Sequence, residues 1–314
     1  MTTGADGTDV PAGHPGPDFL VIGAARSGTT ALCALLGTHP EVRITSPKEP
    51  HFLALHHLGP AAFTGPGDAY TINRVAVTDS ARWLALLGPA DGPLRGEGSV
   101  STLYYAHSAV PTIQQFCPQA RLIVLLRQPA ERAHSAHLYQ TGRGWETESF
   151  ARALTLEPER IAAGWHHLWH YRRMGFYAEQ LAPFVSSFGR ERLLVLDHAR
   201  FEADPEETAR RCARHLDLDP AGFSLTTARV NEGALRPRPI LALERAVRRS
   251  QLLGRAVRTF APKAVRERVR AAGSTRAVLD PALKDELDAG YVDDARRLAA
   301  LLGEDTPEWC RALV

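Results

Sequence analysis

Short continuous runs of apolar residues recur along the first two thirds of the chain, and each run ends near a glycine or a polar residue. The runs at 18–23 (DFLVIG), 121–126 (RLIVLL) and 193–196 (LLVL) are too short to be core helices. Continuous apolar runs, as opposed to alternating ones, are typical of strands covered on both faces of a parallel sheet. A weaker strand is expected at 42–44, and another can end at 96–99 (GEGS).

Segments with helical signals alternate with these strands. Residues 29–37 (TTALCALLG) indicate a helix closed by glycine, and residues 79–87 indicate one capped by aspartate. Two further helices are expected after Gln128-Pro129 and Asp204-Pro205, because proline suits the first helical position. This alternation predicts an α/β fold with a parallel sheet flanked by helices, in which ligands bind at the carboxyl ends of strands.

The pattern divides the chain into three parts. Residues 1–17 are predicted to be a flexible tail, residues 18–230 the α/β domain, and residues 231–314 an Arg-rich helical extension packed on the same domain. The chain has 314 residues with 44% apolar residues, enough for a sizeable core. A net charge of +2 provides no global field that would mark a nucleic-acid binder.

The four cysteines have no paired spacing, and no apolar segment is long enough to cross a bilayer. The first residues also lack the charged and apolar regions of a secretory signal. These features predict a soluble cytoplasmic protein. The sequence leaves the oligomeric state open.

The loop between the first strand and the first helix reads GAARSGTT at residues 23–30. Its G-x-x-x-x-G frame is that of a phosphate-binding loop, whose backbone N–H groups and helix dipole bind an anion. A nucleotide triphosphatase would have lysine where Thr29 stands, so Mg²⁺-dependent phosphoryl transfer is not indicated. The loop suits a 5′-phosphate group, with Arg26 as its cation. The alternative is a glycine-containing turn with no ligand.

A second candidate anion site follows the strongest strand, in the sequence RQPAERAHS at residues 127–135. Arg127 ends the strand, where a guanidinium can bind phosphate with two hydrogen bonds. Arg132 and Ser135 are three residues apart on the helix that follows and so share one side of it. The alternative is a solvated helix face. Two anion sites at successive strand ends fit a nucleotide with phosphate at both ends of one ribose.

Together these motifs resemble those of sulfotransferases that use 3′-phosphoadenylyl sulfate (PAPS), over residues 18–220, and PKEPHFL at 47–53 resembles the segment after the loop in bacterial and heparan-sulfate-type members. The resemblance implies a P-loop-NTPase-like fold, PAPS as donor, and in-line sulfuryl transfer to a hydroxyl or amine. We expect a hydroxyl group in preference to an amine, and no metal. By position it assigns the 5′-phosphosulfate to Arg26, Ser27, Gly28, Thr29 and Thr30. It assigns the 3′-phosphate to Arg127 and Ser135.

The same resemblance names Glu49 as the general base, and Lys48, which adjoins it, is our own candidate for a catalytic cation. Lysine is rare here, with only three in the chain, which gives Lys48 added weight. His51 is the alternative base, expected to point elsewhere on an extended chain. Gly98 stands where heparan-type members have a lysine, and Lys48 is a candidate to replace that charge. The family's glycine-rich C-terminal element is not recognisable, and Arg236 and Arg238 are weak substitutes.

Two further segments have alternative interpretations. Residues 165–171 (WHHLWHY) place His166 and His170 four apart, which favours a packed helix or an aromatic acceptor wall over a metal site, because a third ligand is lacking. Residues 236–276 hold 11 Arg and one Lys against two Glu. They suit a solvated helix face or the docking of an anionic partner.

The sequence therefore predicts a PAPS-dependent sulfotransferase acting on a small-molecule or glycoside acceptor whose identity it does not specify. The alternatives are a P-loop nucleotide or small-molecule kinase and a non-catalytic phosphonucleotide-binding module.

Overall fold

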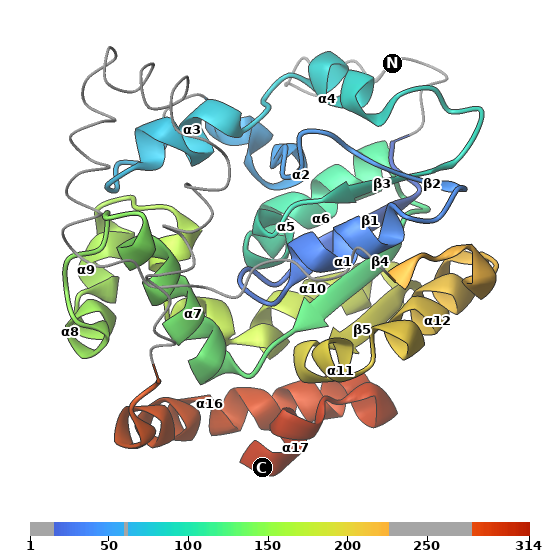
Figure 1. Ribbon diagram of the computed structural model, residues 1–314. Helices are drawn as coiled ribbons and strands as arrows, with labels where there is room; N and C mark the ends of the chain where they lie inside the picture. Colours follow the sequence, from blue (N-terminus) through green and yellow to red (C-terminus); the bar gives the residue numbers. More distant parts are fainter. Residues whose placement is uncertain (1–15, 60–61, 226–277) are drawn as a thin grey trace, which may run out of the picture.

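Five parallel strands form the central sheet of the computed structural model, which describes residues 16–59, 62–225 and 278–314 (Figure 1). The strands lie in the order β2-β3-β1-β4-β5, and every neighbouring pair is parallel. Their bounds are β1 Phe19–Gly23, β2 Val42–Ile44, β3 Leu94–Gly98, β4 Arg121–Leu126 and β5 Leu193–Asp197. The predicted α/β fold with a helix-flanked parallel sheet is confirmed.

Helices cover both faces of this sheet because the side chains of each strand alternate between two apolar clusters. One face, with Phe19 and Val21 of β1, packs on α1 (Thr29–Leu36), α11 (His198–Ala203) and α12 (Pro205–Leu216). The other face, with Leu20 and Ile22, packs on the remaining core helices. Those with residues in this cluster include α2 Phe52–Leu55, α4 Ser80–Leu87, α6 Ala106–Phe116 and α10 Tyr177–Phe188.

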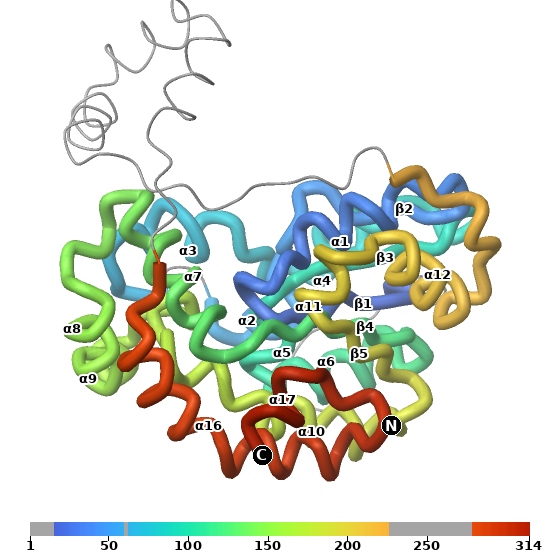
Figure 2. Tube along the Cα trace, turned by 60° about the horizontal axis from the view of Figure 1, so that its bottom comes forward, coloured from blue at the N-terminus to red at the C-terminus, as the bar shows by residue number. Residues whose placement is uncertain are grey.

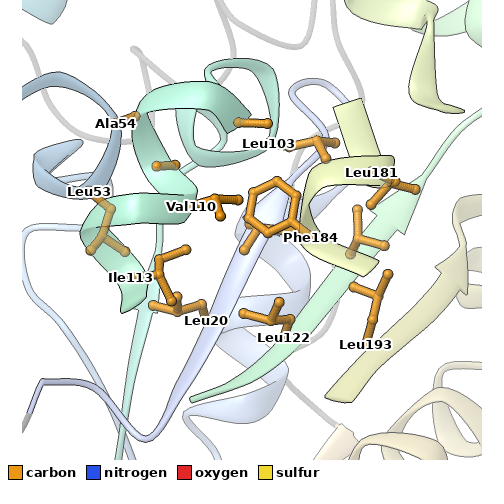
Figure 3. Packing of buried hydrophobic residues seen from close by; sticks show 14 of the residues in the cluster. Leu20, Leu53, Ala54, Leu103, Val110, Ile113, Leu122, Leu181, Phe184 and Leu193 are labelled. Atoms are coloured by element: carbon orange, nitrogen blue, oxygen red, sulfur yellow. The ribbon is translucent and has the colours of Figure 1, made fainter. Parts of the chain in front are cut away.

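The apolar cluster on the face with Leu20 and Ile22 anchors α2 and the segment that precedes it. Figure 3 shows Leu53 and Ala54 of α2 against α6, in the cluster that also holds Phe184 of α10. Phe52 is fully buried and stacks on Trp83 with ring centroids 4.5 Å apart. Full burial of such a side chain is worth about 1.5–3 kcal/mol. The start of α2 is therefore held firmly, and with it residues 48–51.

Helix α7 (Pro129–Gly142) begins at its proline as predicted, with the Gln128 side chain accepting a hydrogen bond from Glu131 N. Beyond it, α8 (Phe150–Thr155) and α9 (Glu157–Ala162) are short. The expected helix through 165–171 is wrong: Gly164 has a φ of +75° and follows the end of α9, and a 3₁₀ turn at His167–Trp169 replaces the helix. His166 and His170 therefore do not share a helix face.

The C-terminal helices α16 (Pro281–Leu302) and α17 (Glu308–Leu313) pack on the α/β domain, with α16 running along α10 and also contacting α7 (Figure 2). Most of the predicted tail lies outside the described residues, as does the whole Arg-rich segment 236–276 with Arg236 and Arg238. Gly16 and Pro17 are buried, and Gly16 N donates to Phe116 O. No described helix is long and apolar enough to span a membrane.

The remaining helices lie in the connections. They are α3 Ile72–Val75 and α5 Ser101–Tyr104, with 3₁₀ turns at His56–Leu58, Asp68–Tyr70, Arg173–Gly175, Arg190–Arg192, Pro220–Gly222 and Gly303–Asp305.

Candidate active site

The loop at residues 23–30 joins the carboxyl end of β1 to the start of α1, as predicted. Ala24 N donates to Leu125 O of β4 at 2.9 Å, which fixes the loop to the sheet. Gly28 has a φ of +91°, and a Cβ there would lie 3.2 Å from His198 Nδ1, so both conformation and space favour glycine. The loop thus directs the N-terminus of α1, where backbone N–H groups are free to bind an anion, toward the carboxyl edge of the sheet.

Arg26 belongs to a group of neighbouring arginines beside this loop. Its guanidinium lies 4.5 Å from the ring centroid of Tyr139, and Arg143 stacks on the same ring at 4.3 Å. Burial lowers the pKa of Arg26; Tyr139 opposes this, while the charges of Arg127, Arg132 and Arg143 lower it further. Cations brought this close repel one another, so the group favours an anionic ligand.

The second motif lies against the first. Arg26 Nε is 3.4 Å from Ser135 Oγ of α7, so the structure brings together a residue predicted for the 5′ end of the nucleotide and one predicted for the 3′ end. Arg127 Nε donates to Glu131 Oε2 at 3.3 Å, and that carboxylate is 47% exposed. An exposed pair of this kind is worth about 0–1 kcal/mol, so Arg127 can turn readily to a phosphate.

Arg132, unlike Arg127, is buried. Its guanidinium is fully buried, donates to Tyr171 O and lies 3.8 Å from Met174 Sδ. It therefore holds the 171–174 segment against α7, and its positive charge acts on Arg26.

Two aromatic residues that contact the loop at 23–30 or Arg127 were not predicted from the sequence. His198, at the carboxyl end of β5, packs on Gly28, and burial followed by the charge of Arg127 lowers its pKa. Tyr177 of α10 donates its hydroxyl hydrogen to Arg127 O at 2.9 Å. The signal for His198 was its place just after a predicted strand; for Tyr177 no sequence signal existed.

Glu49 and Lys48 lie between β2 and α2, and their side chains form an ion pair with Lys48 Nζ 2.6 Å from Glu49 Oε1. Glu49 and His51 both have left-handed backbone, with φ values of +65° and +58°. The expectation that His51 points elsewhere on an extended chain is wrong, because two left-handed residues turn the backbone. His51 Nε2 lies 3.7 Å from Glu49 Oε2.

Exposure and charge distinguish the two candidate bases. The Glu49 side chain is 29% exposed, whereas that of His51 is 5% exposed. Burial would raise the pKa of Glu49, but the charges of Lys48 and then His51 outweigh it and hold the pKa below its ordinary value. Burial lowers the pKa of His51 to about 4. At neutral pH the site therefore presents an ionised Glu49 beside a neutral His51.

Lys48 passes close to Gly98 at the end of β3. A Cβ at Gly98 would lie 3.5 Å from Lys48 Cε and 2.7 Å from Cys33 Sγ. The close approach of Cys33 is what favours glycine at position 98, and the lysine passes it at ordinary van der Waals distance. Burial opposes the charge of Lys48, but Glu49 raises its pKa, so the ammonium stays charged.

The predicted histidine-rich segment lies near this pair. The rings of His51 and His167 have centroids 6.1 Å apart, and His170 Nδ1 lies 2.6 Å from the hydroxyl of Tyr104. His166 Nδ1 pairs with Asp68 Oδ1 at 2.7 Å, so the two histidines spaced for a metal have separate partners. Within the described ranges, no group of three or more His, Cys, Asp or Glu side chains could hold a metal ion.

Comparison with known proteins identifies the family. A model of the sulfotransferase family matches residues 17–221, which is more than half of the chain. The chain belongs to the sulfotransferase family. The resemblance inferred from the two motifs is thereby confirmed, and the comparisons give the kinase and binding-module alternatives no support.

Individual relatives of this chain include proteins named as carbohydrate and heparan sulfate sulfotransferases. It is 26% identical to human carbohydrate sulfotransferase 15, over 65% of this chain and 44% of that protein. It is 27% identical to heparan sulfate glucosamine 3-O-sulfotransferase 3A1 of Mus musculus, over 64% and 46%. The chain thus spans less than half the length of these curated relatives.

A solved structure of similar size matches more completely. The sulfotransferase from Alicyclobacillus acidocaldarius is 28% identical, with a TM-score of 0.72, over 93% of this chain and 98% of that one. The similarity extends across the sheet and helices described above and supports the P-loop-like fold predicted for this sulfotransferase.

Proposed function

We propose that this sulfotransferase transfers the sulfuryl group of PAPS to a hydroxyl group, in preference to an amine, of a small-molecule or glycoside acceptor. The observation that carries the proposal is the Lys48–Glu49 ion pair, whose carboxylate lies near enough to the phosphate-type loop to feel the charge of Arg26. A carboxylate can accept the acceptor's proton, and cations can stabilise the leaving group. Family membership and the arginines around Arg26 support PAPS as the donor.

In the proposed reaction the acceptor hydroxyl gives its proton to Glu49 while its oxygen bonds to sulfur. The bond between sulfur and the bridging phosphosulfate oxygen breaks, and 3′-phosphoadenosine 5′-phosphate (PAP) leaves with the electron pair. The loop residues Arg26, Ser27, Gly28, Thr29 and Thr30 hold the 5′ group, and Arg127 and Ser135 hold the 3′-phosphate. Glu49 later releases its proton to solvent.

Lys48 has two partners in this scheme. While it is paired with Glu49 it lowers the basicity of the carboxylate. When it turns toward the bridging oxygen, it stabilises the developing charge and lets the pKa of Glu49 rise toward its ordinary value. One lysine therefore assists the leaving group and strengthens the base in the same step, from a position next to Gly98.

The cellular setting of the reaction is also a proposal. The four cysteines are free and buried, which suits the cytoplasm as a reducing compartment.

Two measurements test the function. In calorimetry without Mg²⁺ the protein should bind PAP, whereas a kinase would prefer Mg·ATP. Incubation with PAPS and a panel of phenols, glycosides, amines and oligosaccharides, followed by mass spectrometry, should detect an added SO₃ group on at least one hydroxyl compound. Binding of PAP with no transfer to any acceptor would favour a non-catalytic binding module.

A further inference from the structure

The strained backbone of Glu49 and His51 must be held by its surroundings. A non-glycine residue in the left-handed conformation costs on the order of 1–3 kcal/mol, and such conformations persist only where surrounding contacts hold them. Val77 N donates to Pro50 O at 2.8 Å, and the N–H groups of Glu49 and His51 are both held by the turn at residues 98–101 between β3 and α5. Glu49 N donates to Gly98 O at 3.1 Å, and His51 N donates to Ser99 Oγ at 3.1 Å.

A third contact fixes the His51 ring. Its Nδ1 lies 2.8 Å from Ser101 Oγ, which leaves Nε2 on the side of Glu49. Ser99, Ser101 and His51 are each at least 96% buried, so water does not replace a lost partner cheaply. The two serine hydroxyls are thus the side-chain groups that hold both the backbone and the ring of His51.

The side chain of Ser99 also neighbours Glu97. The nearby Ser99 side chain favours the ionised form of the buried Glu97 carboxylate, whose Oε2 accepts a hydrogen bond from Trp83 Nε1 at 2.8 Å. Trp83 is stacked on Phe52, the residue that follows His51. Ser99 therefore lies between His51, to which it is hydrogen-bonded, and the Glu97–Trp83 pair, and Trp83 in turn packs on the start of α2.

We propose that Ser99 and Ser101 are positioning residues for the transfer reaction, which hold the turn of backbone at 49–51 and thereby aim the Glu49 carboxylate at the acceptor hydroxyl. The inference rests on the proposed role of Glu49 as base. A base must lie within hydrogen-bond reach of the proton it takes, and a misplacement of 1 Å can cost on the order of 100-fold in rate. Neither serine needs to touch a substrate.

The test uses a near-isosteric pair, Ser99→Thr and Ser99→Val, because both add the same bulk and only threonine keeps a hydroxyl. PAP release from PAPS is measured with water as the acceptor, so no acceptor need be known. We expect Ser99→Val to be slower than Ser99→Thr by about 10- to 100-fold. PAP affinity should be the same in both.

A second readout reports on Glu49 directly. The groups that face it are Lys48, His51 and Arg26, with Glu97 and Cys33 nearby. If Glu49 moves away from Lys48, its pKa must rise. A carbon NMR titration of Glu49, assigned by comparison with Glu49→Gln, should therefore give a higher pKa in Ser99→Val than in Ser99→Thr. A residue that only stabilises the fold would not produce this shift.

Thr45→Val is the matched control. Thr45 is also buried and lies near the same segment, but its Oγ1 has no hydrogen-bond partner within the described residues. It should keep the wild-type rate. If Ser99→Val does not fold, Ser101→Ala replaces it, with Ser101→Thr as the rescue.

Equal rates and equal Glu49 pKa values in the two Ser99 variants, with Glu49→Gln inactive, would overturn this inference alone. A Glu49→Gln protein that releases PAP at the wild-type rate would overturn the base assignment and the inference together. A loss of rate in Thr45→Val as large as that in Ser99→Val would also overturn the positioning role.

Discussion

At the residue scale, Glu49 is the side chain on which the proposed chemistry depends. Glu49→Gln keeps the shape and removes the ability to accept a proton, so kcat should fall by about 10²- to 10⁴-fold. Donor affinity should stay nearly unchanged, since Glu49 is not assigned to the nucleotide. Steady-state kinetics and PAP calorimetry on the same preparation check both statements. Near-normal turnover in Glu49→Gln with an inactive His51→Ala would transfer the base role to His51.

The charge of Lys48 sets the pH at which Glu49 works. Glu49 is active when ionised, and its pKa is held below the ordinary value, so kcat/KM should rise with pH in a limb that lies below the range in which an unperturbed glutamate titrates. Lys48→Ala removes the cation, the Glu49 pKa rises, and the limb should move to higher pH. The limb should be absent in Glu49→Gln. A pH profile of kcat/KM, with circular dichroism to confirm folding at each pH, checks this. An unmoved limb in Lys48→Ala would contradict the pairing.

The residue types at this site could be predicted from the sequence, but their conformations could not. Position in a motif was enough to select Lys48 and Glu49. Nothing in PKEPHFL signals that Glu49 and His51 are left-handed, because the contacts that stabilise this backbone come from distant residues: Val77, and the turn at 98–101 about 50 residues away. The resemblance to the family selected the residues, and tertiary contacts decided how they meet.

At the element scale, the strands and the helices that begin at proline were predictable because local signals decide them. The runs at 18–23 and 121–126 match β1 and β4 closely, and α7 begins at Pro129. The segment 165–171 was predicted wrongly because the four-residue spacing of His166 and His170 fits a helix face, whereas tertiary partners decide the backbone here. Asp68 binds both His166 N and the Trp169 indole, and these contacts replace helical hydrogen bonds. The strand order in the sheet has no local signal either.

Helix α16 is predicted to be an integral part of the core. Leu298 is 1% exposed and lies in the main apolar cluster, so Leu298→Ala should lower the free energy of unfolding by about 2–5 kcal/mol. Urea unfolding measures the change. Val278→Ala is the control, because Val278 is 85% exposed and should cost almost nothing. Equal stability of the two variants would mean that α16 unfolds separately from the sheet.

At the scale of the whole molecule, one rigid sheet brings distant segments to a single edge. The loop after β1, the turn after β3, Arg127 after β4 and His198 after β5 all follow carboxyl ends of parallel strands. The same sheet thereby places the residues proposed to bind the donor and those that hold the proposed base. Because the two predicted phosphate sites already meet through Arg26 and Ser135, a nucleotide with phosphate at both ends should bind them as a unit.

This arrangement predicts how nucleotides stabilise the protein. A ligand at 100 times its Kd raises the free energy of unfolding by about 2.7 kcal/mol, so PAP should raise the melting temperature without Mg²⁺. Arg127→Ala should greatly weaken binding of PAP and leave 5′-AMP, which lacks the 3′-phosphate, almost unaffected. Added salt should reduce the difference between PAP and 5′-AMP in the wild type, since it screens exposed charges. Calorimetry of both nucleotides with both proteins measures these effects. Equal losses for PAP and 5′-AMP in Arg127→Ala would place the 3′-phosphate elsewhere, and Arg127 would then be a residue that merely supports the loop.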